Sequence, residues 1–240
     1  MEFRRVLFRS SAKVFASASR AISAGLCDAA IVGGVDSLCM TTLYGFSSLE
    51  LLSTQACRPS DISRDGISIG EGAGFALLEK TDFGNTGMAL LGYGESSDAH
   101  HMSTPHPEGK GAISAMQEAL SRANLEPYQI DYINLHGTST KSNDAAEGQA
   151  VFALFGNNTA ASSTKGWTGH TLGAAGMTEA IISALCVENN MVPCSLNTTQ
   201  IDPSIPIQVL KEHQHKPINR VLSNSFGFGG SNCSLIIGRG

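Results

Sequence analysis

The chain has 240 residues, 42% of them hydrophobic and 15% charged, with a formal net charge of −5. This length allows a sizeable core, and the acidic balance provides no basic surface for a nucleic-acid backbone. No apolar run is long enough to cross a bilayer, and the six cysteines form no C-x-x-C pair and predict no metal site. We therefore expect a cytoplasmic protein with reduced thiols and neither nucleic-acid nor membrane partners.

The first part of the chain alternates helical and extended patterns, which is typical of an α/β protein. A serine at the start and Gly25 at the end predict a helix over residues 11–25. The apolar run AAIVGGV predicts a short buried strand over 29–35. The elements predicted next are a helix over 43–52, a polar loop over 58–66 and a strand over 74–78. The GNTG cluster at 84–87 indicates a boundary between units at 11–84 and 85–240.

The second part continues the α/β pattern. The predicted strands cover 88–93, 130–135, 220–225 and 234–237, and the predicted helices cover 112–123, 143–155 and 173–189. The glycine turn GFGG is expected to join the last two strands. Residues 99–109 form a predicted loop with His100, His101 and His106. No carboxylate or cysteine stands at ligand spacing there, so we interpret it as a solvated loop rather than a metal site.

Three segments of this second part carry residues suited to catalysis. LHGTSTKSNDAAE (135–147) places His136 at the end of a strand, where α/β proteins hold their ligands. STKGWTGHTLGAAG (163–176) places Lys165 five residues before His170, which precedes a glycine-rich helix start. NSFGFGG (224–230) has glycines that free backbone N–H groups to face a reacting oxygen. Any one segment alone could be structural, but the three in this order are far more specific.

Together these segments resemble the thiolase-like condensing enzymes, specifically the decarboxylating β-ketoacyl-acyl-carrier-protein synthases. VGGVDS (32–37), RPSDISRDG (58–66) and GEGAGFALLEK (70–80) also resemble segments of that family. The resemblance extends from Ser11 to Gly240. It implies a thiolase-like α/β/α/β/α layered fold with a complete C-terminal half and a partial N-terminal half.

The resemblance also implies a function. It implies an acyltransferase that condenses an acyl thioester with malonyl-acyl carrier protein in fatty acid, polyene or polyketide synthesis. The implied partners are acyl carrier protein and a second subunit, in a homodimer or a ketosynthase heterodimer. No cofactor is implied, because the substrates are carried on the phosphopantetheine arm of the carrier protein.

Residue roles follow from the same resemblance. His136 and His170 would donate hydrogen bonds to the thioester oxygen and stabilise the enolate. Lys165 would lie near Glu147 and organise the site electrostatically. Thr138 and Thr140 would bind the pantetheine arm through their hydroxyls. Phe228 would be a gate whose backbone N–H completes an oxyanion hole, and Phe46 would line the acyl pocket.

The nucleophilic cysteine that the family places at a helix start is absent. Alignment on Ser11 puts Phe8 at its position. Cys27 lies past the far end of the helix, where the dipole raises a thiol pKa, so it is no substitute. We therefore expect residues 1–10 to be foreign and this chain to be inactive and prone to aggregate. The alternative is a natural non-catalytic partner subunit that determines chain length.

A more distant alternative is a serine hydrolase. Residues 66–70 read GISIG, a literal match to the nucleophile elbow G-x-S-x-G with Ser68 as nucleophile. That elbow needs a strand before the serine and a helix after it. Here a polar loop precedes the serine and glycines followed by a strand come after it, so the context disfavours a hydrolase.

Overall fold

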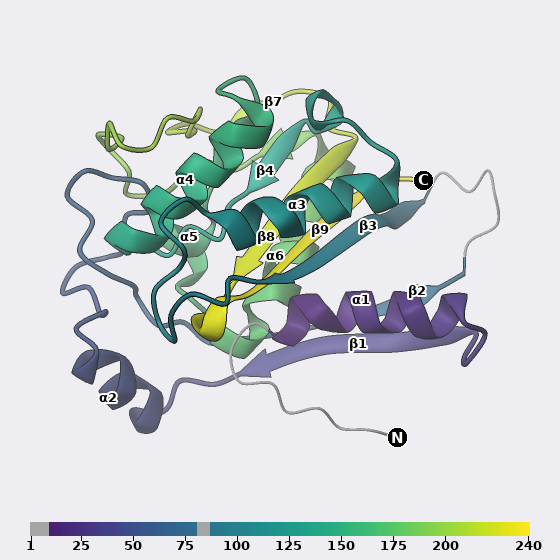
Figure 1. The fold of residues 1–240 in the computed structure, drawn as a ribbon, viewed down its shortest axis with the longest axis horizontal. Coiled ribbons are helices and arrows are strands. Elements are labelled where there is room, and N and C mark those ends of the chain that lie inside the picture. The colour runs from purple at the N-terminus through teal and green to yellow at the C-terminus, as the bar shows by residue number, and fades with distance from the viewer. Residues whose placement is uncertain (1–9, 81–86) are drawn as a thin grey trace.

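The computed structural model describes residues 10–80 and 87–240 (Figure 1). The first of these stretches contains α1 (Ser10–Ser23), β1 (Ala29–Asp36), α2 (Met40–Ser48) and β2 (Gly72–Glu79). The longer elements of the second stretch are β3 (Met88–Ser97), α3 (Lys110–Ala123), α4 (Lys141–Phe155), α6 (Ala175–Asn189), β8 (Arg220–Phe226) and β9 (Ser231–Arg239). Its short strands and α-helix are β4 (Tyr132–Asn134), β5 (Ala160–Ser162), α5 (Lys165–Thr168), β6 (Met191–Val192) and β7 (Gln214–His215).

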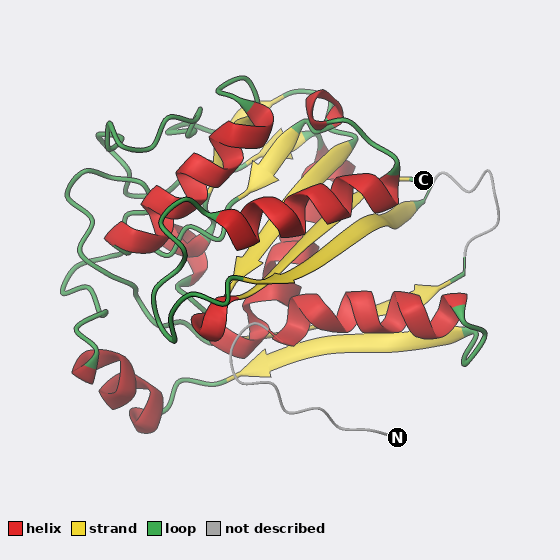
Figure 2. Ribbon diagram, viewed as in Figure 1, coloured by secondary structure: helices red, strands yellow, loops and turns green. Residues whose placement is uncertain are grey.

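A mixed sheet in the order β3-β9-β8-β4-β5 lies at the centre of the second stretch. Helices α3 and α4 cover one face of this sheet, and α6 covers the other (Figures 1 and 2). Helices α1 and α6 contact each other and both contact β1 and β2, which form a separate antiparallel sheet. The order of layers is therefore β1–β2, then α1 with α6, then the five-stranded sheet, then α3 with α4. The predicted α/β class is confirmed.

Helix α1 shows how local sequence fixes an element. Its apolar face buries Ala12 and Phe15 in a cluster shared with β1, α6 and β9. The helix ends two residues before Gly25, whose φ of +69° is left-handed backbone that glycine adopts at no steric cost. The N–H of Leu26 then donates to the carbonyl of Ala21, which has no partner within the helix.

The prediction of a buried strand over 29–35 is wrong in part. The strand forms, but only alternate side chains such as Val32 pack against α1 and α6. Ile31 is 78% exposed, and Phe75 on the paired β2 is 65% exposed. Among the described residues no helix covers this second face of the β1–β2 sheet.

Other boundaries moved by a few residues. The helix predicted over 43–52 is α2, which ends at Ser48, before the left-handed Glu50. The predicted hairpin is confirmed, because β8 and β9 pair in antiparallel register across a 3₁₀ turn, Phe228–Gly230. Strands β5, β6 and β7 and helix α5 were not predicted, since each has four residues or fewer. The boundary predicted at 84/85 lies outside the described residues, and so do all but the last of residues 1–10, which are predicted to be foreign. Both stay predictions.

None of the helices in residues 10–80 and 87–240 is long and apolar enough to span a bilayer.

Candidate active site

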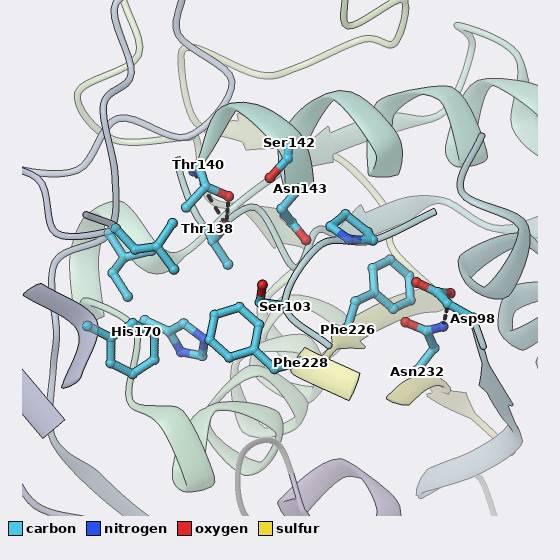
Figure 3. A pocket seen from close by; sticks show the side chains of 15 residues that line it. Asp98, Ser103, Thr138, Thr140, Ser142, Asn143, His170, Phe226, Phe228 and Asn232 are labelled. Atoms are coloured by element: carbon cyan, nitrogen blue, oxygen red, sulfur yellow. Dashed lines mark hydrogen bonds between the residues drawn. The ribbon is translucent and has the colours of Figure 1, made fainter. Parts of the chain in front are cut away.

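A cavity of about 50 Å³ opens at the carboxyl ends of β4 and β8 (Figure 3). His170 and Phe228 lie together on one side of it, and Thr138 and Thr140 lie across from them. Segments far apart in the chain form its wall: Phe46, Leu51, Ile67, Asp98, Ser103, Pro105, Thr138, Thr140, Ser142, Asn143, His170, Phe226, Gly227, Phe228 and Asn232.

His136 follows β4 and is completely buried. The carboxylate of Glu147, on α4, accepts the backbone N–H groups of His136 and Gly137 at 2.8 Å each. The φ of Gly137 is +38°, so a glycine suits this sharp turn after the strand. Glu147 therefore fixes the turn that carries the histidine. Burial raises the pKa of Glu147 to about 7, although the two N–H groups favour its ionised form.

Lys165, at the start of α5, is buried beside His136. Its ammonium donates to the carbonyl oxygen of His136 at 2.5 Å, and its Nζ lies 3.3 Å from Nδ1 of the ring. Its ion-pair partner is Glu179 of α6. The sequence predicts Lys165 near Glu147, and both contact the backbone of His136, but the carboxylate paired with the lysine is that of Glu179. Glu147 is occupied by the backbone of the 136–137 turn, and Glu179 is the acid that the packing of α6 brings to the lysine.

Sequence reasoning missed Glu179. It is the only charged residue in AGMTEAIISALCV (175–187), and it is 3% exposed. Burying an ionised side chain in a helix of small and apolar residues costs free energy unless the charge is paired. That isolation was the available signal.

His170 precedes α6, and its backbone forms a bridge with Ile69. The N–H of Leu172 donates to Nδ1 of the His170 ring at 3.2 Å. The rings of His136 and His170 lie edge to face with centroids 5.3 Å apart. The predicted convergence of the two histidines is confirmed. Because a donor faces Nδ1 of each ring, a neutral ring carries its proton on Nε2 in both cases.

Phe228 begins the 3₁₀ turn between β8 and β9. Its ring stacks on Phe46 of α2, with centroids 5.8 Å apart. Both belong with Ile67 and Leu172 to a small apolar cluster at the cavity. The turn is held by Gly229, whose N–H donates to the carbonyl of Met102 at 2.7 Å.

The two predicted pantetheine-binding hydroxyls lie together on the cavity wall. Oγ1 of Thr138 and Oγ1 of Thr140 are 2.9 Å apart (Figure 3). Across the cavity, Asn232 donates to the carboxylate of Asp98 at 2.7 Å. Asp98 and Asn232 were not singled out from the sequence, because neither lies in a segment with a recognisable pattern.

A network of charged side chains next to the 138–140 segment was not predicted from the sequence. Arg64 is 2% exposed; it donates to Asp202 at 2.6 Å and its Nε lies 3.7 Å from Asp144. Asp144 in turn accepts the backbone N–H groups of Ser60 and Ser139. The segment 58–66, predicted as a polar loop, is thus anchored under the 138–140 segment.

Ser68 does not stand at a nucleophile elbow. Its hydroxyl accepts the N–H of Cys57, and its carbonyl accepts the N–H of His170 at 2.7 Å. An irregular segment and then β2 follow it, with no helix. The geometry that a serine hydrolase needs is therefore not formed.

In the 99–109 loop His100 and His101 are exposed and His106 is partly buried, whereas His136 and His170 are buried. The rings of His100 and His106 are 4.9 Å apart, and Nδ1 of His101 accepts the N–H of Ser103. Within the described part of the chain, no three His, Cys, Asp or Glu side chains gather as metal ligands.

Comparison with known proteins identifies the family. Residues 9–83 match the model of the beta-ketoacyl synthase N-terminal domain, and residues 88–199 match that of the C-terminal domain. The 3-oxoacyl-[acyl-carrier-protein] synthase 2 of Rhizobium meliloti is 43% identical over 96% of this chain and 58% of its own length. The mitochondrial 3-oxoacyl-[acyl-carrier-protein] synthase of Arabidopsis thaliana is 41% identical over 91% of this chain and 52% of its own length.

Solved structures agree. A ketosynthase in complex with its chain length factor from Xenorhabdus doucetiae is similar with a TM-score of 0.90 and 47% identity, over 96% of this chain and 58% of that one. A beta-ketoacyl synthase from Burkholderia phymatum is similar with a TM-score of 0.92 and 34% identity, over 98% of this chain and 60% of that one. The chain spans little more than half the length of these proteins. It belongs to the beta-ketoacyl synthase family.

Proposed function

We propose that this site serves the decarboxylative condensation of a β-ketoacyl-acyl-carrier-protein synthase. In that reaction the bond from the malonyl thioester to its carboxylate breaks and carbon dioxide leaves. The enolate carbon then attacks the carbonyl of an acyl group held on a cysteine, and the cysteine thiolate departs. Negative charge develops on the malonyl thioester oxygen, so catalysis needs fixed hydrogen-bond donors at that oxygen.

The observation that carries the proposal is the pair of buried histidines, 5.3 Å apart, each with a donor at Nδ1. This arrangement favours two neutral rings that each offer Nε2–H. Two such donors suit one enolate oxygen, and their fixed positions remove the cost of reorganisation. The ion pair of Lys165 with Glu179 holds the first ring, so the lysine acts as an organiser and not as a base.

The other residues have supporting roles in the proposal. Glu147 fixes the turn of His136, and Thr138 and Thr140 bind the pantetheine arm at the cavity wall. The backbone N–H of Phe228 completes the oxyanion hole for the acyl carbonyl. Phe46 lines the acyl pocket, where its ring stacks on that of Phe228.

Partners and setting belong to the same proposal. The substrates are delivered by acyl carrier protein, and the working assembly is a homodimer or a ketosynthase heterodimer in the cytoplasm. A solved type II polyketide ketosynthase in complex with its acyl-carrier protein, 27% identical to this chain with a TM-score of 0.90, supports that carrier. The phosphopantetheine arm is the only prosthetic group that the proposal requires.

Acyl transfer is a different matter from decarboxylation. None of the six cysteines lines the cavity formed by the described residues. The family position of the nucleophile falls on Phe8, which lies outside those residues. We therefore propose that this chain forms no acyl-enzyme, while the donors for decarboxylation are retained.

The second candidate function is a partner subunit without a nucleophile. Two similar solved structures each contain a ketosynthase and a chain length factor, and this observation favours the partner-subunit function. The intact network of His136, His170 and Lys165 is an argument against it, because a subunit without chemistry does not need these groups.

The proposal is tested by release of labelled carbon dioxide from malonyl-acyl carrier protein. We expect the chain to release it, and His136→Gln or His170→Gln to lower the rate about 100-fold or more, as for loss of an oxyanion donor. His215→Gln is the matched control, since His215 is exposed on β7. Equal rates in all four proteins, at the rate without protein, would favour the partner subunit.

Acylation is tested separately with a labelled acyl thioester and denaturing gels. We expect no label on the chain and label on Phe8→Cys, because the thiolate is the attacking species. Label on the unmodified chain contradicts the proposal, and label mapped to Ser68 would revive the hydrolase.

A further inference from the structure

Asp36 is the last residue of β1 and carries a contact that no motif explains. Its Oδ2 accepts the backbone N–H of Gly173 at 2.8 Å, across 137 positions of sequence. Asp36 belongs to the part of the chain that matches the N-terminal family model, and Gly173 to the part that matches the C-terminal one. The contact therefore joins the two parts at one point.

Gly173 lies in the turn that follows His170. The preceding residue, Leu172, has a φ of +47°, a left-handed conformation that is unfavourable for a non-glycine residue. This conformation accompanies the N–H bond of Leu172 to Nδ1 of the His170 ring. Two successive N–H groups of the turn thus have side-chain acceptors, one the histidine ring and the other the Asp36 carboxylate.

Both sides of the strained residue are anchored. The side chain of Leu172 is 3% exposed and packs in the cluster with Phe46 and Ile67. Its main chain is held through Gly173 by Asp36. The fit is close, since a Cβ at Gly173 would lie 3.0 Å from Oδ2 of Asp36. A bond from an N–H to a carboxylate is stronger than one to a neutral acceptor, which suits a strained turn.

We propose that Asp36 is a positioning residue that sets the tautomer and orientation of His170. By holding Gly173 it keeps Leu172 left-handed, and Leu172 N–H then occupies Nδ1 of the ring. The ring proton then stays on Nε2, the atom with which His170 donates in the proposed function. This role of Asp36 rests on that proposed function. Without the carboxylate, the turn relaxes and the ring is free to exchange its two tautomers.

The test reads the ring directly. The full chain is labelled with ¹⁵N-histidine, and long-range ¹H–¹⁵N spectra are recorded, with His170 assigned from the His170→Gln spectrum. We expect the signals of an Nε2–H tautomer in the unmodified chain. In Asp36→Ala the two nitrogen shifts should move toward each other, as in a tautomer mixture. Asp36→Asn should restore the original pattern, since its amide oxygen accepts the same N–H.

Glu71→Ala is the matched control. Glu71 is also a carboxylate bonded to a backbone N–H, that of Leu38 at 3.2 Å, and it precedes the residue paired with Asp36 in the β1–β2 ladder. Its loss should leave the His170 shifts unchanged. An equal change in Glu71→Ala overturns the proposal, because it would show a general loosening of the β1–β2 sheet.

Unchanged His170 shifts in a cooperatively melting Asp36→Ala protein also overturn it. Should Asp36→Ala fail to fold, Asp36→Glu decides, because it keeps the charge but displaces the carboxylate by one methylene. A changed pattern then supports the proposal and an unchanged one refutes it. A different outcome separates the two proposals. If the unmodified chain shows the Nε2–H signals of His170 but releases no carbon dioxide, the result counts against the proposed function and not against the positioning role of Asp36.

Discussion

The sheet that leads to the two histidines is covered on both faces, whereas the β1–β2 sheet is covered on one. Every residue of β4 and β5 is buried, and so are all but the first residue of β8. In β1 and β2 only Val32 and Gly74 are buried to that degree. The first sheet lies between α6 and the pair α3 and α4, and the second rests on α1 and α6 alone.

This difference separates two ways of building a site. His136, Lys165 and Glu179 all come from the well-packed region, where burial makes their mutual contacts strong. The β1–β2 region and the segment between its strands contribute by contact from outside, through Phe46, Asp36 and the carbonyl of Ser68. In the proposed function, the groups that carry the chemistry therefore lie in one region, and some of the groups that align them lie in the other.

The largest effect that would sharpen this comparison is expected at the buried ion pair. Lys165 and Glu179 are 1% and 4% exposed at their side chains. Lys165→Met leaves the carboxylate buried without its partner, so we expect a loss of about 3–5 kcal/mol in the free energy of unfolding. Urea denaturation followed by circular dichroism measures it.

The control is the double variant Lys165→Met with Glu179→Leu. It removes both charges, so most of the lost stability should return. A double variant as unstable as the single one would show that packing, and not the uncompensated charge, determines the cost.

The next effect compares the two sheets with one chemical change. Leu222→Ala in β8 removes a completely buried side chain, for which about 2–5 kcal/mol is expected. Leu77→Ala in β2 removes one that is 63% exposed, and a change within about 0.5 kcal/mol is expected. Similar losses in the two variants would contradict the one-sided cover of the β1–β2 sheet.

A third effect depends on pH. The pKa of Glu147 is about 7 in the folded chain against an ordinary value of 4.5. A raised carboxyl pKa means that the folded state binds the proton more tightly. The stability from this group is therefore full below about pH 4.5 and is lost as the pH rises through about 7. We expect Glu147→Gln to flatten the fall of melting temperature across this range.

Other groups titrate over the same range, so the difference between the two curves is the measurement. Asp144, whose pKa burial also raises, is retained in both proteins, but its charge also raises the pKa of Glu147. The difference between the curves therefore reports the coupled titration of Glu147 and Asp144. Parallel curves for the unmodified chain and Glu147→Gln would contradict the raised pKa.

Local patterns were sufficient where local physics decides. Gly25 fixed the end of α1, and the hairpin of β8 and β9 followed from its glycine turn. The convergence of His136 and His170 followed from a strand end and a motif order. For Gly25 and the hairpin the determining residues lie within a few positions of one another. The two histidines lie far apart in the chain, and their convergence followed from the shared sheet edge and the family resemblance.

The rest depended on distant contacts. AAIVGGV is apolar at every position, so no alternation revealed that Ile31 faces outward. The pairing of Lys165 with Glu179 was missed because Glu147 and Glu179 lie on different helices, and only their packing decides which one pairs with the lysine. The link from Asp36 to Gly173 spans 137 positions and has no local pattern.

The smallest effect is expected where the two regions meet at the surface. Arg20 of α1 donates to Glu95 of β3 at 2.6 Å, and its guanidinium lies 5.6 Å from the ring centre of Tyr93. The side chain of Arg20 is half exposed, so solvent screens the pair and we expect a coupling of about 0.2–1 kcal/mol. A double-mutant cycle of Arg20→Ala and Glu95→Ala measures this coupling energy, and 0.5 M salt should reduce it.

The pair of Arg122 with Glu118, within α3, is the matched control. A coupling several times larger for Arg20 with Glu95 would mean that this contact, and not the buried cluster of Phe15 and Val32, holds the two regions together.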